Sequence, residues 1–336
     1  MRGTPDVIAA QLVDPPAIVG AVFGALSGDA IAAAVDGLCI AQLGSAVAEV
    51  EFFSASQGCV FGLALDDARR VVVKTHGPGT DVAFLSAVQA VQRRAVQAGF
   101  PAPAPLLAPT PLCAGNAIAE TLLDAGILVD AHDPALRRAV ASGLVALIAA
   151  CRGPLPPGIE AGPLGRDGGQ LWPQPHDARL DFGATASGAE WIDAIATRAL
   201  TIRKPGDLVI GHSDWRVEHL RIGGDGRVSA TYDWDSISVA AECWFAGAAA
   251  SSFTVDLERG LTRPDPDELL AFVDDYEIAR GRPFAAAERR GVHASAVYLT
   301  AYTARCEHSN TMLGWGGPNS PSAGDVLPAL AAQLLG

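Results

Sequence analysis

Residues 211–236 read "GHSDWRVEHLRIGGDGRVSATYDWDS", and this stretch decides the fold. It opens on His212 and Asp214 and closes on Asp233 and Asp235. Between these pairs, "HLRI" and "RVSATY" are typical of short strands, and "GGDG" is a strong turn signal. An antiparallel hairpin returns its second end to the level of its first. We therefore expect Asp214 and Asp233 to lie side by side.

Length and composition indicate a globular protein with two lobes. The chain has 336 residues, of which 49% are hydrophobic, and this is too long for one minimal core. Asp and Glu number 37 against 24 Lys and Arg, which gives a net charge of −13. Because binding to a phosphate backbone requires a basic face, we expect no nucleic-acid partner. A cationic small molecule is compatible with the acidic field.

Neither the cysteines nor the apolar runs indicate secretion or a membrane. The six cysteines are scattered and form no CxxC pair. The N-terminal "MRGTPDVIAAQLVDPP" lacks the apolar run and cleavage site of a signal peptide. The most apolar later window begins at Val239 and contains Glu242, so it falls short of about 18 uncharged residues. We expect a cytoplasmic protein with no membrane partner, and the sequence does not indicate its oligomeric state.

The first part of the chain predicts a helical extension followed by a strand-rich lobe. Residues 1–46 are rich in Ala and Val and are expected to form one or two helices. The runs "AEVEFFSAS", "CVFGLAL" and "RRVVVKTH" then predict a strand meander. Apolar residues at helical spacing predict a helix over 81–98, which Gly99 ends. Two further strands, "LLAPTPL" and "NAIAETLL", complete a lobe over 47–123.

The remainder, 124–336, predicts a larger lobe that is mainly helical. Asp133–Pro134 and Asp265–Pro266 are each typical of a helix start, with an N-cap followed by Pro at the first helical position. Further helices are expected around 189–199, around 239–253 and after Glu288. Residues 153–169 are rich in Pro and Gly and predict a loop. The fold class is therefore α+β with two lobes.

In combination, these loops resemble those of the aminoglycoside phosphotransferase and choline kinase family. The family's first loop reads His-Gly-Asp with an Asn five residues after the Asp, and its second reads Asp-Trp-Glu or Asp-Trp-Asp; this chain has "HSD" and "DWDS". The resemblance implies that Asp214 is the catalytic base and that His212 organises the loop. It also implies that Asp233 is the principal magnesium ligand, with Asp235 as the second acidic residue. Arg216 stands where protein kinases place a Lys near the transferred phosphate, and a guanidinium suits that role.

The resemblance extends to the nucleotide-binding strands. Lys74, which ends the Val run of "RRVVVKTH", matches the strand Lys that grips the nucleotide phosphates. "AIAETLLDAG" matches the fifth strand and the interlobe linker, which implies that Glu120, Thr121 and Leu122 lie near the edge of the base. The resemblance spans roughly residues 48–310. It implies a bilobal, protein-kinase-like fold with a small antiparallel-sheet N-lobe and a larger helical C-lobe.

Two departures from the family pattern concern the cation and the lysine. His219 replaces the metal-binding Asn, and because Mg²⁺ prefers oxygen ligands, metal affinity or preference is expected to change. The family's helix Glu, which pairs with the strand Lys, is missing, since no Glu stands between Asp81 and Gly99. We expect Gln89 in its place, with Gln92 as the second choice, offering a hydrogen bond without a charge.

Structural alternatives stay open for several of these residues. His212 taken alone is typical of a core histidine, and Lys74 of an edge strand. His219 could face solvent at the start of its strand, and Asp235 could cap a following helix. Trp215, beside Asp214, could either pack in the core or line the acceptor site.

The resemblance implies an enzyme that transfers the γ-phosphate of ATP or GTP to a hydroxyl of a small molecule, with Mg²⁺ or Mn²⁺. The acceptor class would be an aminoglycoside-like antibiotic or another amine-bearing alcohol. Two other functions stay open. One is a nucleotide-binding pseudokinase without transfer activity, which the replaced Asn and the missing Glu favour. The other is a metal-dependent hydrolase with His212, Asp214 and His219 as ligands.

Overall fold

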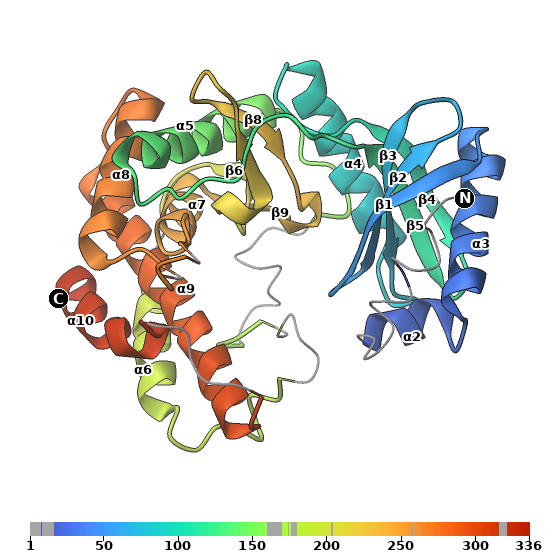
Figure 1. Cartoon of the computed structure of the whole chain (residues 1–336). Coiled ribbons are helices and arrows are strands. Elements are labelled where there is room, and N and C mark those ends of the chain that lie inside the picture. The colour runs from blue at the N-terminus through green and yellow to red at the C-terminus, as the bar shows by residue number, and fades with distance from the viewer. Residues whose placement is uncertain are drawn as a thin grey trace. The chain divides into compact units, whose positions relative to one another are not determined.

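The computed structural model describes residues 8, 17–159, 170–173, 175, 180–202, 204–256, 258–261, 263–315 and 321–336 (Figure 1). The chain forms two compact units. The first consists of Met1–Ala98, Ala102–Asp124 and Pro156–Gly158, and the second of Gly99–Pro101, Ala125–Leu155 and Ile159–Gly336. One unit is rich in strands and the other in helices, which confirms the α+β class. Most of the predicted loop 153–169 lies outside the described residues.

The first unit is built on a five-stranded antiparallel sheet. Its strand order is β1-β2-β3-β5-β4. The predicted meander forms its first three strands, because β-branched and aromatic runs alternate with turn residues. The strands are β1 (Val47–Ala55), β2 (Cys59–Leu65), β3 (Arg70–His76), β4 (Pro105–Leu112) and β5 (Gly115–Thr121).

One face of the sheet is covered by N-terminal helices. Phe61, Val73 and Ala119 stand opposite one another across β2, β3 and β5, and all three are fully buried. They share a hydrophobic core with α2 (Ala17–Phe23) and α3 (Gly28–Leu38), which continues as a π-helical turn over Cys39–Leu43. The described part of the predicted helical extension therefore packs on the sheet.

The opposite face carries Val72, Lys74 and Glu120, because side chains alternate along each strand. Helix α4 (Val82–Gln97) contacts this part of the unit. It begins where Asp81 accepts a hydrogen bond from the amide of Ala83, a cap worth about 1 kcal/mol. The predicted helix over 81–98 is thus confirmed.

The second unit is mainly helical. Asp133 caps α5, and Asp265 forms a capping box with Glu268 at the start of α8, as the Asp-Pro pairs predict. The long helix α9 packs against α6, α7 and α10 (Figure 1). The helices are α5 (Pro134–Ala150), α6 (Glu190–Thr201), α7 (Glu242–Ala250), α8 (Pro266–Arg280), α9 (Ala286–Met312) and α10 (Ala323–Leu335).

One helix prediction in this unit is wrong at its start. The helix expected over 239–253 begins only at Glu242, because Ile237–Ala241 forms strand β9 and pairs with β6 (Leu208–His212). The helix expected after Glu288 is confirmed as α9, and a further helix, α10, which contains Pro328, follows it.

The predicted hairpin is confirmed. It consists of β7 (Leu220–Ile222) and β8 (Val228–Thr231), and Gly226 at its tip has a φ of 73°. Short 3₁₀ turns flank it, η3 (Val217–His219) before β7 and η4 (Trp234–Ser236) after β8.

Among the residues that the structure describes, no single helix is both long and apolar enough to cross a membrane. The bent pair Ala17–Phe23 and Gly28–Leu43 meets the criteria of length and composition only when its two helices are taken together.

Candidate active site

Two strand pairs in the second unit bring the acidic loops together. Just beyond the β6–β9 pair, the amide of Ser213 donates to the carbonyl of Ser236 at 2.8 Å. Just beyond the β7–β8 hairpin, the amide of Tyr232 donates to the carbonyl of His219 at 2.8 Å. The loop that leaves β6 and the loop that leaves β8 are therefore held against each other by backbone hydrogen bonds.

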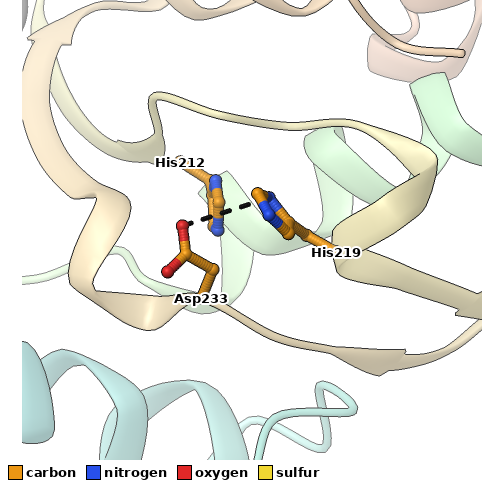
Figure 2. Close-up of side chains that lie close together, drawn as sticks. All are labelled: His212, His219 and Asp233. Carbon is orange, nitrogen blue, oxygen red and sulfur yellow. Dashed lines mark ion pairs between the residues drawn. The ribbon is translucent and has the colours of Figure 1, made fainter. Parts of the chain in front are cut away.

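Asp214 and Asp233 lie beside the same imidazole. The Nδ1 atom of His219 lies 3.6 Å from Oδ2 of Asp214. The same atom lies 4.0 Å from Oδ2 of Asp233, the ion pair marked by the dashed line in Figure 2. Both carboxylates are 39% exposed, so both can reach a solute. The hairpin thus places the two acids together, as its sequence predicts.

His212 is fully buried behind this pair. Its Nδ1 accepts a hydrogen bond from the amide of Asp214 at 3.2 Å, and its Nε2 lies 3.1 Å from the carbonyl of Tyr232. These partners require a neutral ring with its proton on Nε2. Burial lowers the pKa of His212, which favours the same neutral form, although the charge of Asp233 opposes the shift. The ring therefore fixes the backbone amide of Asp214.

Asp233 has a left-handed backbone, with φ 55° and ψ 48°. Asp is among the few side chains that tolerate this region, which usually costs about 1–2 kcal/mol. The carboxylate is held by Ser236, whose hydroxyl donates to Oδ2 at 2.5 Å. Strain of this kind concentrates at functional sites, where the surrounding structure enforces it.

The donor atoms here fit a divalent cation. Over the described part of the chain, His212, His219 and Asp233 form the one group of three His, Cys, Asp or Glu with ligand atoms within 4.8 Å of one another. His212 uses both of its nitrogens in hydrogen bonds, which counts against it as a ligand and against the hydrolase alternative. His219 donates from Nδ1 to the carbonyl of Asp214 at 2.9 Å, which leaves the lone pair of Nε2 for a metal. Asp233 supplies a hard oxygen that suits Mg²⁺, and the imidazole also suits Mn²⁺.

Arg216 lies between two acids. Its Nε is 3.3 Å from Oδ1 of Asp214 and 3.1 Å from Oε2 of Glu218. The side chain is 38% exposed, so it can also meet an anionic solute.

Two of the open structural alternatives are settled by the fold. Asp235 lies within η4 and is followed by strand β9, so it does not cap a helix; Ala241 stands at the N-cap of α7. Trp215 is buried and donates from its indole to the carbonyl of Val140 at 2.9 Å, so it packs in the core.

In the first unit, Lys74 is paired with an acid from the neighbouring strand. Its Nζ lies 3.0 Å from Oε1 of Glu120, and both residues are buried. The other oxygen of Glu120 accepts a hydrogen bond from Nε2 of Gln92 at 2.7 Å. The Nε2 of Gln89 donates instead to the carbonyl of Leu107 at 2.7 Å. The second choice, Gln92, therefore occupies the place expected for Gln89 next to the charged pair.

The residues expected at the base edge are only partly available to a base. Glu120 directs its side chain at Lys74 rather than toward a linker. The amide of Thr121 donates to Ala104, and that of Leu122 donates to Arg70. The hydroxyl of Thr121 also accepts a hydrogen bond from the amide of Ala104 at 2.8 Å, so the amide and the hydroxyl of Thr121 both bond to Ala104.

Phe52 is a candidate that the sequence reasoning missed. It stands opposite Gly62 on β2, which in turn stands opposite Val72, so its ring shares the sheet face of Lys74. A Cβ on Gly62 would lie 2.1 Å from that ring, and the ring is 41% exposed. The available signal was the pair "FF" in β1, since consecutive strand residues point to opposite faces.

Comparisons with known proteins agree with this geometry. The model of a family described as "Phosphotransferase enzyme family" matches residues 60–285. The curated proteins gave no match.

Three solved structures illustrate the likeness in fold. An amicoumacin kinase in complex with AMP-PNP, Ca²⁺ and Ami has a TM-score of 0.62 at 10% identity, covering 91% of this chain and 95% of its own. A thermostable mutant of the aminoglycoside phosphotransferase APH(4)-Ia, with AMP-PNP and hygromycin B, has a TM-score of 0.55 at 15% identity, with coverages of 89% and 98%. A choline/ethanolamine kinase family protein from Mesorhizobium loti has a TM-score of 0.54 at 14% identity, with coverages of 91% and 93%.

Proposed function

Because the chain belongs to the phosphotransferase enzyme family, we propose that it moves the γ-phosphate of ATP or GTP onto a hydroxyl of an amine-bearing small molecule. One observation carries this proposal: Asp214 and Asp233 flank a single imidazole nitrogen, at 3.6 and 4.0 Å. Phosphoryl transfer needs one acid for the attacking hydroxyl and another for the cation on the nucleotide phosphates.

Asp214 acts on the acceptor. Its carboxylate orients the acceptor hydroxyl and takes its proton as the oxygen attacks the γ-phosphorus. The bond from the γ-phosphorus to the bridging oxygen breaks, and the nucleoside diphosphate leaves. His212 fixes the backbone amide of Asp214 and keeps the loop in register. Arg216 swings from its acidic neighbours to meet the transferred phosphate.

Asp233 and His219 hold the cation, with Asp235 as a further acid in the same loop. The cation, Mg²⁺ or Mn²⁺, neutralises the phosphate oxygens when bound. In the first unit, Lys74 binds nucleotide phosphate, and Phe52 stacks on the base. Thr121 and Leu122 meet the base edge.

The donor and acceptor classes rest on similarity and charge. Solved structures of similar fold contain AMP-PNP, and two contain the acceptors amicoumacin and hygromycin B. The net charge of −13 suits an acceptor that carries amines.

A transfer assay tests this proposal. The protein is incubated with ATP or GTP, Mg²⁺ or Mn²⁺, and a panel of aminoglycosides, choline and ethanolamine. The product is then scored by mass spectrometry for one added phosphate. We expect transfer by the wild type, and a rate about 10²–10⁴-fold lower for Asp214→Asn.

The pseudokinase alternative predicts a different outcome. The replacement of Asn by His219 favours it. Tight nucleotide binding, combined with no transfer and no nucleotide hydrolysis with either metal, would select it over the enzyme.

A further inference from the structure

The charged pair of Lys74 and Glu120 is formed within the sheet. Val72 stands directly opposite Glu120 across β3 and β5, and Lys74 follows Val72 by two residues on the same face. Lys74 and Glu120 are therefore diagonal neighbours, a spacing that long side chains can bridge. Their charged atoms meet at 3.0 Å.

Burial makes each partner necessary to the other. Lys74 is 8% exposed and Glu120 is 4% exposed. A buried charge is strongly disfavoured unless an opposite charge accompanies it. The ammonium of Lys74 therefore needs a neighbouring carboxylate to remain charged, and the same carboxylate fixes the direction in which it points.

No acidic residue of helix α4 can supply that carboxylate. The helix reads "VAFLSAVQAVQRRAVQ" over Val82–Gln97, without Asp or Glu. Its contribution is an amide: Nε2 of Gln92 donates to the second oxygen of Glu120 at 2.7 Å. The carboxylate thus has one oxygen fixed by the helix and the other directed at the lysine.

We propose that Glu120 is a positioning residue that holds the ammonium of Lys74 in place for nucleotide phosphate, with Gln92 fixing the carboxylate. This rests on the phosphate-binding role proposed for Lys74. It gives Glu120 a place beside the phosphates instead of the expected place at the base edge. The position of the Lys74 ammonium is then set by strand pairing rather than by a helix, because the β3–β5 register places Glu120 beside Lys74.

Four variants test this role. Glu120→Gln keeps the size and removes the charge. The exchange Glu120→Gln/Gln92→Glu keeps the hydrogen bond between positions 120 and 92 but places the carboxylate on helix α4 instead of strand β5. Lys74→Ala removes the lysine. Glu51→Gln is the matched control, since Glu51 lies in the same sheet and pairs with a different cation, Arg70, at 2.5 Å.

The readouts are the dissociation constants of AMP-PNP and its guanine counterpart with Mn²⁺ by calorimetry, with thermal unfolding of the free protein as a check on folding. We expect Glu120→Gln and Lys74→Ala to weaken binding about tenfold or more, which is the loss of one charge-assisted contact of about 1.4 kcal/mol. The exchange variant should recover most of the loss, and the control should bind like the wild type. A role in stability alone would lower the unfolding temperature without this pattern of loss and recovery.

Three results would overturn the proposal. One is a folded Glu120→Gln that binds like the wild type while Lys74→Ala is weakened; this removes the role of Glu120 and leaves that of Lys74 intact. The other, decisive if Glu120→Gln does not fold, is a folded exchange variant that binds as weakly as Lys74→Ala. Wild-type binding by Lys74→Ala would instead remove the phosphate-binding role of Lys74 itself, and the proposal with it.

Discussion

At the scale of single residues, His219 stands where the family resemblance implies a metal-binding Asn. Its ring lies beside both loop carboxylates, with Nδ1 bonded to the carbonyl of Asp214. An imidazole ligand shifts preference from Mg²⁺ toward Mn²⁺.

Replacing His219 with the family's Asn should therefore reverse this preference. We expect His219→Asn to raise the ratio of Mg²⁺-supported to Mn²⁺-supported activity about tenfold, equal to about 1.4 kcal/mol of differential binding. The ratio is measured with saturating nucleotide and each metal in turn. An unchanged ratio would show that His219 does not ligate the cation.

Phe52 offers a second residue-scale prediction. Its exposed ring lies over Gly62 on the lysine face of the sheet. Stacking of a base on an aromatic ring is worth about 1–3 kcal/mol. We expect Phe52→Ala to raise the dissociation constant of ATP or GTP about tenfold or more, and Phe52→Tyr to bind like the wild type. Equal affinity in all three proteins would contradict the stacking role.

At the scale of elements, the hairpin sets the relation between the acidic loops, and a neighbouring segment anchors the hairpin. Ile127 pairs with Ile222 of β7, and the hydroxyl of Ser229 on β8 donates to the carbonyl of Ala125 at 2.7 Å. Gly126 lies between them with a φ of 91°, where a Cβ would lie 2.7 Å from the carbonyl oxygen of Ile222. Only glycine fits there without strain.

A side chain at Gly126 should therefore disturb the hairpin. We expect Gly126→Ala to lower the free energy of unfolding by about 1–3 kcal/mol. Gly224→Ala, at a turn position with open space around it, serves as the control. Chemical denaturation measures both variants, and equal stability of the two would contradict the anchoring role.

Local signals in the sequence predicted most helices and strands but not every strand pairing. The caps at Asp133 and Asp265 were predicted because capping depends on neighbouring residues. The strand over 237–241 was not, since its apolar run fits a helix or a strand and only pairing with β6 decides.

The candidate site shows the same division between local and long-range information. The turn signal predicts that Asp214 and Asp233 lie side by side, and the family resemblance implies their roles. The partner of Lys74 could not be predicted, because the contact to Glu120 depends on the β3–β5 register rather than on helical spacing.

At the scale of the whole molecule, His212 and His293 link stability to pH. Burial lowers the pKa of His212, and burial followed by the charge of Arg289 lowers the pKa of His293. Below the ordinary histidine pKa of about 6.5, the folded state therefore binds fewer protons at these two residues than the unfolded chain does. Their contribution to stability is present above that pH and is lost as the pH falls.

We expect the unfolding temperature of the wild type to fall as the pH is lowered from about 8 to about 5, and to fall less in His293→Gln. Calorimetric scans across this range measure the difference. Parallel curves for the two proteins would contradict a neutral His293 in the folded protein.

The proposed nucleotide site depends on a cation held by Asp233. The most direct test is a thermal-shift titration of ATP and GTP, each with Mg²⁺ and with Mn²⁺. It compares the wild type, Asp233→Ala and Asp225→Ala, an acid at the tip of the same hairpin whose carboxylate accepts from the amide of Arg227. A ligand stabilises the fold that binds it, so we predict a metal-dependent rise in unfolding temperature for the wild type and Asp225→Ala that Asp233→Ala loses. No rise in the wild type with any pair, or an equal rise in Asp233→Ala, would contradict the claim.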